Sequence, residues 1–428
     1  MQAVNKAFAA LRDLGDPESM ELLARHGLAP GVRPKVNLHI HLPPNFSAFQ
    51  SVAQAVGLAG EQGVGVLGAS NYYHYDVYSD FAEQARRHGI FPLFGLEIIA
   101  RIDGLLRTGA RINDPGNPGK MYICGMGITC FDQMTDEARR LIQIIRRNDS
   151  QRMVEMINRM ARLFASRGLQ THLDEPAIVD MVARRHACPR ETVCLQERHV
   201  AQAFQEVLFE RVPAEQRSER LREIFGAEPQ TDPQDPVKVQ NEIRSHLMKA
   251  GKPAFVPEAF INFDQAYRLI LELGGIPCYP TLADGTIPIC AYEDPVEKLI
   301  GSLKAAGIHC VELIPIRNKP GVLAHYVKAM RRAGLVVTAG TEHNTLDMLP
   351  MEPTCLAGQP IDEELKEIFW EGACVVAAHQ FLSLHGRCGF VDGDGRPNMK
   401  YSSDEERIKA FRSLGAAIIQ RYYETNQA

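Results

Sequence analysis

Apolar positions along the first hundred residues follow two alternating patterns. Continuous apolar runs at 35–41, 64–70 and 90–100 predict strands, and the segments 51–63 and 79–89 between them have the spacing of amphipathic helices. Because the strands are apolar throughout instead of alternating with polar residues, they predict a parallel sheet that is covered on both faces. The β-α-β-α-β order therefore indicates an α/β fold.

The pattern is interrupted and then resumes. An exposed loop rich in Gly, Pro, Asn and Asp (110–120) precedes a strand at 121–129, and residues 131–250 show helical periodicity with charge pairs at i, i+4. Further helix–strand pairs then follow, with helices at 264–274, 294–306, 320–333 and 361–370, and strands at 274–280, 307–315, 334–344 and 372–382. Seven or eight such units predict a distorted TIM-like barrel with a mostly helical insertion.

These boundaries give the expected domain organisation. It consists of an N-terminal helical extension (1–34), the first part of the barrel (35–130), the helical insertion (131–250), the second part of the barrel (251–390) and a C-terminal helix (391–428). Ser403, followed three residues later by Glu406, is typical of a helix start and predicts that the last helix begins there.

Several of the predicted strands end in polar side chains, which is where α/β barrels place their chemistry. His39 and His41 alternate on the first strand, so both point to one face and can form half of a metal site. Glu97 lies in the apolar strand FPLFGLEII, where a carboxylate is costly unless it pairs with an arginine or binds a metal. The same reasoning applies to Glu342 and His343 in VVTAGTEHN.

Other residues have weaker support. His199 lies on a predicted helix and His74 in a tyrosine-rich loop, so each is either a structural histidine or part of a site. Arg317 and Arg198 have the planar fork that binds anions. The tyrosines at strand ends either pack as aromatic residues or bind substrate and transfer protons; they are Tyr72, Tyr122 and Tyr279.

Composition narrows the classes of function. With 52 acidic and 47 basic residues the net charge is −5, which disfavours duplex nucleic acid as a partner. No apolar run of membrane-spanning length and no signal peptide is visible, and the ten cysteines form no CxxC pair. We therefore expect a cytoplasmic protein without a membrane partner that acts on a small polar or anionic molecule; a homo-oligomer is compatible with the sequence. Phosphate loops, GxSxG elbows and GxGxxG turns are absent.

Two short motifs resemble a known superfamily. NLHIH (37–41) is similar to the opening HxH motif of the PHP (polymerase and histidinol phosphatase) proteins, and FGLEI (94–98) is similar to their GxE motif. The segments QERHVAQAF (196–204), LMKAGKPAFVP (247–257) and FDQAYRLILELGGIPCYP (263–280) resemble the insertion-containing PHP subgroup that cleaves phosphate esters of nucleotides. The resemblance extends over about residues 35–345.

The resemblance implies a PHP barrel with a rebuilt metal site. His39, His41, Glu97 and His199 match metal-ligand positions, Glu342 matches in type, and His343 lies one position out of register. Several other ligand positions are replaced, because the family's Thr-Asp-His reads Ser70-Asn71-Tyr72 and two further histidines read Tyr122 and Tyr279. We therefore expect one or two divalent ions (Mn²⁺, Zn²⁺ or Fe²⁺) instead of three, and an insertion that caps the pocket.

The main hypothesis is a metal-dependent hydrolase, a phosphoesterase that uses metal-activated water on a small phosphorylated metabolite. One alternative is a lyase, isomerase or non-phosphate hydrolase acting on a sugar-like molecule with one metal or none, and another is a non-catalytic binding protein with this fold. The expected catalytic residues are His74, Tyr72, Tyr122 and Arg317; the expected substrate-binding residues are Asn71, Arg198, Tyr279 and Asn344; the expected metal ligands are His39, His41, Glu97, His199, Glu342 and His343.

Overall fold

Seven strands form a nearly closed mixed barrel in the computed structural model, which describes residues 6–26 and 33–427. In spatial order they are β1 (Lys35–Ile40), β2 (Val64–Ala69), β3 (Phe91–Arg101), β4 (Lys120–Met126), β6 (Ile276–Thr281), β7 (Cys310–Leu313) and β8 (Val336–Ala339). A bridge between Ile40 and Glu342 brings the two ends of this order together, and the short β5 (Ile261–Asn262) pairs with β3. The predicted α/β barrel is confirmed.

The parallel arrangement predicted for β1, β2 and β3 is confirmed, but the next strand differs from the all-parallel order of a TIM barrel. β4 runs antiparallel to both of its neighbours, β3 and β6. The chain passes from β3 to β4 through the short helix α5 (Asp103–Thr108) and the Gly/Pro-rich loop, which is not a helical crossover against the sheet. A connection of this kind returns the chain in the opposite direction, whereas a parallel neighbour needs a crossover.

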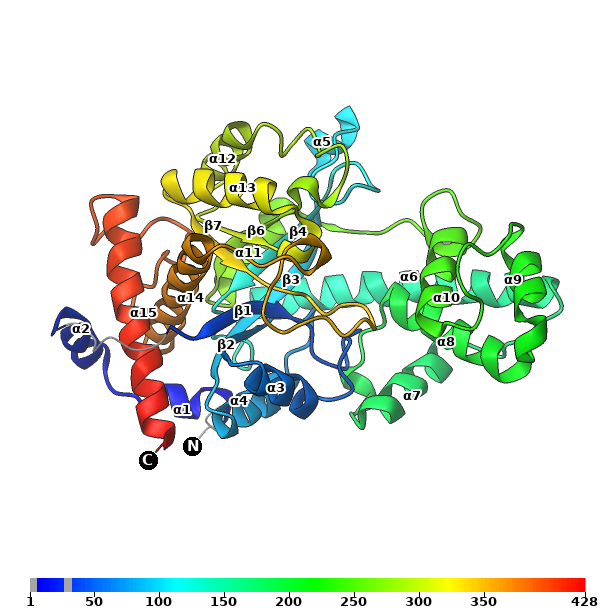
Figure 1. Cartoon of the computed structure of the whole chain (residues 1–428), viewed down its shortest axis with the longest axis horizontal. Helices are drawn as coiled ribbons and strands as arrows, with labels where there is room; N and C mark the ends of the chain where they lie inside the picture. Colours follow the sequence, from blue (N-terminus) through cyan, green and yellow to red (C-terminus); the bar gives the residue numbers. More distant parts are fainter. Residues whose placement is uncertain (1–5, 27–32, 428) are drawn as a thin grey trace.

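Helices cover the outside of the barrel (Figure 1). They are α1 (Ala9–Arg12), α3 (Val52–Glu61), α4 (Val77–Arg87), α11 (Phe263–Glu272), α12 (Val296–Ala305), α13 (Pro320–Arg332), α14 (Glu363–Leu384) and α15 (Asp404–Gln427), and α2 (Pro17–His26) packs on α15. The amide of Glu406 donates to Ser403 Oγ at 3.2 Å, so the predicted start of the last helix is confirmed. In the part of the chain described, no helix is both long and apolar enough to cross a bilayer.

The strand predicted at 372–382 is instead part of α14. Every residue in this stretch is buried, because the helix packs between the barrel and α15. A helix that is buried on all sides has no polar face, so its apolar run looks the same as that of a buried strand. A side chain at Gly372 would collide with the Val337 carbonyl, and this glycine allows the helix to approach the sheet closely.

The insertion forms a second helical unit beside the barrel, shown in green at the right of Figure 1. Its helices are α6 (Asp136–Ser166), α7 (Glu175–His186), α8 (Glu197–Arg211), α9 (Arg217–Phe225) and α10 (Pro236–Ile243). Helix α6 joins the two units, since Leu141 is buried in the barrel core and Met156 in a separate core of the insertion. The cavity described below lies where these two units meet.

Candidate metal centre

Three side chains that the sequence analysis selected meet inside the barrel. His39 is on β1, His41 directly follows the end of β1, and Glu97 is on β3. The Nε2 atoms of the two histidines are 3.4 Å apart, and Glu97 Oε2 is 3.1 Å from His41 Nε2 and 3.7 Å from His39 Nε2. All three residues are buried, with exposed fractions of 1%, 0% and 5%.

This geometry fits a bound divalent ion. A tetrahedral metal with bonds of about 2.0–2.1 Å separates its ligand atoms by roughly 3.3 Å, which is close to the observed spacings. Glu97 Oε2 is buried and makes no hydrogen bond with any described residue, although a buried carboxylate oxygen normally has a partner. Two imidazole nitrogens and one carboxylate oxygen form a donor set that suits Zn²⁺, Fe²⁺ or Mn²⁺.

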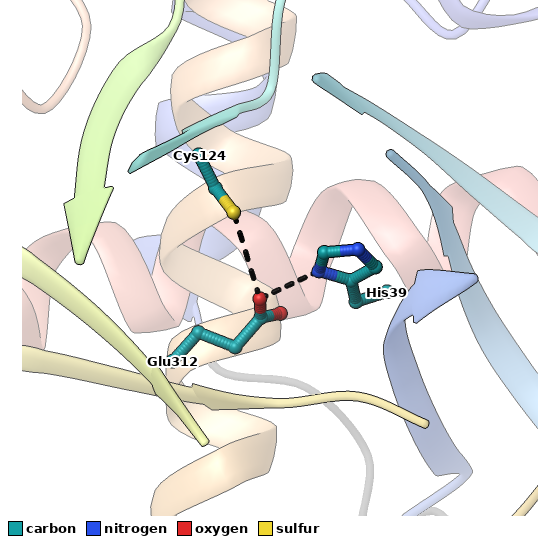
Figure 2. Close-up of side chains that lie close together, drawn as sticks. All are labelled: His39, Cys124 and Glu312. Carbon is teal, nitrogen blue, oxygen red and sulfur yellow. Dashed lines mark hydrogen bonds and ion pairs between the residues drawn. The ribbon is translucent and has the colours of Figure 1, made fainter. Parts of the chain in front are cut away.

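A fourth residue, Glu312 on β7, orients His39. Its Oε2 atom lies 2.7 Å from His39 Nδ1, and both side chains are almost fully buried (Figure 2). Because a carboxylate only accepts, His39 Nδ1 carries a proton, and Nε2, which faces Glu97 and His41, is the nitrogen that a metal ion could bind in place of a second proton. Such a carboxylate–histidine pair is the usual partner arrangement of a metal-binding histidine. His41 Nδ1, in contrast, has no hydrogen-bond partner in the described chain.

Cys124 on β4 completes this group. It pairs in register with Glu97, and its thiol points at Glu312 with an Sγ to Oε2 distance of 3.9 Å (Figure 2). His39 Nδ1, Cys124 Sγ and Glu312 Oε2 also lie close enough together to suggest a metal site. However, the 2.7 Å separation of the nitrogen and oxygen is a hydrogen-bond length. Burial, reinforced by Glu312, raises the pKa of the Cys124 thiol well above its usual value, so the thiol stays protonated.

The local field favours a cation at this place. Burial alone lowers the pKa of His39, but the carboxylates of Glu312, Glu97 and Glu342 outweigh burial and raise this pKa to about 9. Three acidic groups that act on one buried imidazole create a strongly negative region. A divalent ion placed between the histidines and Glu97 would neutralise that region without a proton on the ring.

Glu342 lies near this group but is held by an arginine. The guanidinium of Arg317 donates to both carboxylate oxygens of Glu342, with an Nη1 to Oε1 distance of 2.8 Å, and Asn344 donates to the same carboxylate. Burial raises the pKa of Glu342, but Arg317 and His39 outweigh it and lower this pKa to about 2. The alternative of a salt bridge, considered for this glutamate from sequence, is what the structure contains.

His343 is not brought to the centre. Its Nδ1 lies 2.7 Å from Thr341 Oγ1, its Nε2 lies 3.0 Å from the Leu349 carbonyl oxygen, and its ring stacks on Phe49. Glu342 and His343 both have positive φ, at 57° and 50°, which is strained for residues other than glycine. Glu342 lines the cavity whereas His343 packs on Phe49, so the structure does not bring His343 to the histidine pair as the sequence led us to expect.

His199 is also separate from the histidine pair. It lies on the other side of Phe46, against which its ring packs edge-on, and it lines a different cavity together with His186. Its Nδ1 accepts from the Gln196 amide at 3.0 Å as part of the start of α8. Burial lowers the pKa of His199 to about 3, so it is neutral, and here it serves as a helix cap and not as a ligand of the group around His39.

Three further predicted site residues have structural partners instead of facing the cavity. Asn71 bonds the backbone of Leu42 through both its side-chain oxygen and its side-chain nitrogen, each at 2.8 Å. The hydroxyl of Tyr279 donates to Glu293 at 2.7 Å, and His74 lies 3.6 Å from Asp76. Asn71 and Tyr279 sit at strand ends and His74 sits in the tyrosine-rich loop, as expected, but their side chains contact the surrounding loops.

The remaining predicted residues line one cavity of about 580 Å³ that opens onto Glu97. They are Tyr72, Tyr122, Arg198, Arg317, Glu342 and Asn344. The ring of Tyr72 stacks on His41, with ring centroids 5.1 Å apart and planes 3° from parallel. Burial raises the pKa of Tyr122 to about 12, against the opposing effect of Lys120, so its hydroxyl keeps its proton at neutral pH. A cavity of this size accommodates a small metabolite.

Several residues of the site have no predicted role from sequence. Glu312 ends an apolar strand in the same way as Glu97, and that signal was present in VELIP. Cys124 could not be told from the other buried thiols by its sequence context. A set of charged residues from α6, α8 and the segment before β5 also lines the cavity, and no sequence motif marks them. They are Asp149, Arg152, Glu197 and Glu258.

Comparison with known proteins supports the fold. The sequence matches no protein-family model and no curated protein. A crystal structure from Bifidobacterium adolescentis, described as a "putative metal-dependent phosphoesterase", superposes with a TM-score of 0.53 at 13% identity and covers 79% of this chain and 96% of that one. The two chains share one fold. An amidohydrolase structure from Chromobacterium violaceum, with bound sulfate and no metal, gives a TM-score of 0.48 at 17% identity and covers 78% and 96% of the two chains. The α/β barrel with a helical insertion that the sequence predicts is thus also the fold of the Bifidobacterium adolescentis protein.

Proposed function

We propose that this protein is a metal-dependent phosphoesterase that acts on a small phosphorylated metabolite and holds one divalent ion. The observation that carries the proposal is that one donor atom each from His39, His41 and Glu97 converge at metal-ligand spacing in a buried place. When bound, a divalent ion supplies Lewis acidity, because it lowers the pKa of water toward about 7 and polarises a phosphoryl oxygen. The shared fold with a protein named as a metal-dependent phosphoesterase is consistent with this function.

The guanidinium of Arg317 lies beside this centre, at the carboxylate where a second metal ion would otherwise bind. Its guanidinium neutralises Glu342, which would otherwise be available to a second metal ion. A guanidinium remains charged at every physiological pH and offers donors in a planar fork that suits phosphate oxygens. We therefore expect a single metal ion per chain, with the remaining donors of Arg317 available to hydrogen-bond a phosphoryl oxygen.

Arg198 is suited to hold the substrate anion. It lines the cavity at the start of α8 and, in the described chain, makes neither a hydrogen bond nor an ion pair, with only the ring of Phe46 at 6.0 Å. Burial and the nearby Arg244 lower the pKa of Arg198 to about 10, so it is still charged at neutral pH. Tyr72 and Tyr122, which keep their protons, can donate hydrogen bonds to the leaving group or to phosphate oxygens.

Phosphate release from a panel of phosphate monoesters tests this function. The purified protein is stripped of metal, reconstituted with Zn²⁺, Mn²⁺ or Fe²⁺, and assayed beside His41→Ala and the control His325→Ala, an exposed histidine on α13. We expect hydrolysis that requires metal, is lost in His41→Ala and is retained in His325→Ala. Tight metal binding without phosphate release from any ester would contradict the proposed reaction and favour a hydrolase of another bond.

A further inference from the structure

The charges on the walls of the cavity balance one another. Six cationic and six acidic residues line it, and most of them form ion pairs within the protein. Lys120, for example, lies 3.1 Å from Asp114 and 3.0 Å from Glu258, and Arg152 donates to Glu197. Because the walls have no net charge, the charge that a substrate can bring is set by the metal centre.

A single phosphate group matches that charge. The dianion of a phosphate monoester offsets the two positive charges of one divalent ion, and Arg198, which lacks an ion pair among the described residues, can contact it. The buried Glu312 shifts this balance by only one unit. A second anionic group on the substrate would leave at least one negative charge without a partner, which is costly in an enclosed site. The rest of the substrate therefore carries no further anionic group.

Two tyrosines present neutral hydroxyl groups to the same cavity. Tyr122 on β4 lines it, and its hydroxyl makes no hydrogen bond with any described residue. The hydroxyl of Tyr73, which also lines the cavity, accepts from the Ile99 amide at 3.4 Å and keeps its own proton free to donate. Burial raises the pKa of both hydroxyls above the ordinary value, so both remain protonated donors at neutral pH.

Strand register places these hydroxyls near the metal centre. Ile99, whose amide bonds Tyr73, pairs directly with Tyr122 across β3 and β4. Glu97 and its partner Cys124 form the pair two residues away on the same face of these strands. At about 3.3 Å per residue, the two tyrosines lie about 7 Å along the strands from the level of Glu97. A group held at the metal centre reaches this level through roughly five covalent bonds.

A third hydroxyl lies on the neighbouring strand. Asn113 donates to the carbonyl oxygens of Tyr122 and Pro280, at 2.9 and 2.8 Å, and so links β4 to β6 at this level. Thr281, the next residue of β6, also lines the cavity, and its buried hydroxyl has no partner in the described part of the chain. Buried hydroxyls normally have a hydrogen-bond partner, so this place indicates a polar ligand group.

We infer that the substrate is the phosphate monoester of an uncharged polyol or sugar, and that Tyr73 and Tyr122 bind its hydroxyl groups. The inference rests on the proposed function for its phosphate end, which the metal centre and Arg198 receive. Hydroxyl groups suit this part of the cavity because they accept the tyrosine protons, can donate in turn to oxygens such as that of Thr281, and add no charge.

Binding of phosphonates, which have no ester bond to cleave, tests this inference without requiring turnover. Calorimetric titration of the zinc-loaded, full-length protein compares butylphosphonate with a butylphosphonate that has three hydroxyl groups and with one that ends in a carboxylate. We expect the trihydroxy compound to bind about tenfold more tightly than butylphosphonate, the effect of two or three hydrogen bonds, and the carboxylate to bind no more tightly. In the double variant Tyr73→Phe with Tyr122→Phe, which keeps both rings, the preference for the hydroxylated compound should disappear.

A matched control is Tyr267→Phe, because the Tyr267 hydroxyl donates to the Gly307 carbonyl oxygen from α11, outside the barrel. It should keep the preference. Equal affinity for the plain and hydroxylated compounds, a preference that survives the double variant, tighter binding of the carboxylate, or no binding by any phosphonate would each overturn the inference.

Phosphate release is assayed separately, so the two proposals can fail independently. Release from many esters without regard to their hydroxyl groups would support the proposed reaction and contradict the polyol substrate. A preference for hydroxyl groups in binding, without release from any ester, would contradict the reaction and support the hydroxyl-binding role of Tyr73 and Tyr122.

Discussion

Replacing Glu312 by Gln probes how the metal centre is organised without touching a proposed ligand. The amide oxygen of Gln can still accept from His39 Nδ1, so the side chain keeps its shape and the buried proton keeps a partner. What is lost is the negative charge 2.7 Å from the imidazole, in a place where Glu312 has no exposed surface. The charge makes His39 Nε2 a better donor and fixes the tautomer that leaves its lone pair free.

The expected size of the effect follows from that arrangement. Loss of the carboxylate behind a metal-binding histidine typically weakens metal affinity 10- to 100-fold, which corresponds to about 1.4–2.7 kcal/mol. Because both partners are almost fully buried, water cannot take over the role of the carboxylate. We therefore expect a reduction near the upper end of this range.

Competition with a chromogenic chelator measures the Kd for Zn²⁺ in the wild type and in Glu312→Gln. Glu293→Gln is the control, since Glu293 is another fully buried glutamate of the barrel, and Tyr279 donates to it away from the centre. The control should bind Zn²⁺ as tightly as the wild type. An unchanged Kd in Glu312→Gln would refute the reasoning, because it would mean that His39 does not bind metal through Nε2.

Four other substitutions have expected outcomes. Arg198→Met should raise KM for phosphate esters about tenfold with a smaller change in kcat, measured by steady-state kinetics, because it removes a charge-assisted contact to the substrate anion. Gly415→Ala should lower the free energy of unfolding by about 2 kcal/mol, because the new methyl group would collide with the Cys374 carbonyl oxygen. Gly57→Ala should instead raise the free energy of unfolding by about 1 kcal/mol, because this position on α3 has open space around it. Denaturant titration measures both effects. Burial lowers the pKa of His379 to about 4, below its unfolded value of 6.5, so the unfolded state binds more protons between these pH values and stability falls as the pH drops. Between pH 7 and pH 5 the wild type should lose about 2 kcal/mol more than His379→Gln does, and parallel losses in the two proteins would contradict this assignment.

The sequence predicted the barrel well where strand and helix patterns differ. Apolar runs such as 64–70 lie between amphipathic helices, and the structure has a strand there. The run 372–382 was misjudged because a helix buried on every side has no polar face, and its residues look like a central strand. The direction of β4 depends on the path of a Gly/Pro-rich loop, which the apolar pattern does not encode.

The candidate site was predictable only where isolated polar residues sit in apolar strands. His39, His41 and Glu97 stood out for that reason, and the structure brings them together. Glu312 carries the same signal and was given no role. His343 and Asn71 lie at strand ends like the residues that meet, but local turns direct their side chains to backbone partners, a choice that depends on φ values and loop geometry.

Anomalous diffraction from crystals of the purified protein, collected above and below the absorption edges of zinc, iron and manganese, tests the central claim most directly. The account predicts one peak per chain, about 2.0–2.2 Å from His39 Nε2, His41 Nε2 and a Glu97 oxygen. A metal-loaded protein with its peak elsewhere, such as between Cys124 and Glu312, or with a second peak at Glu342, would contradict it.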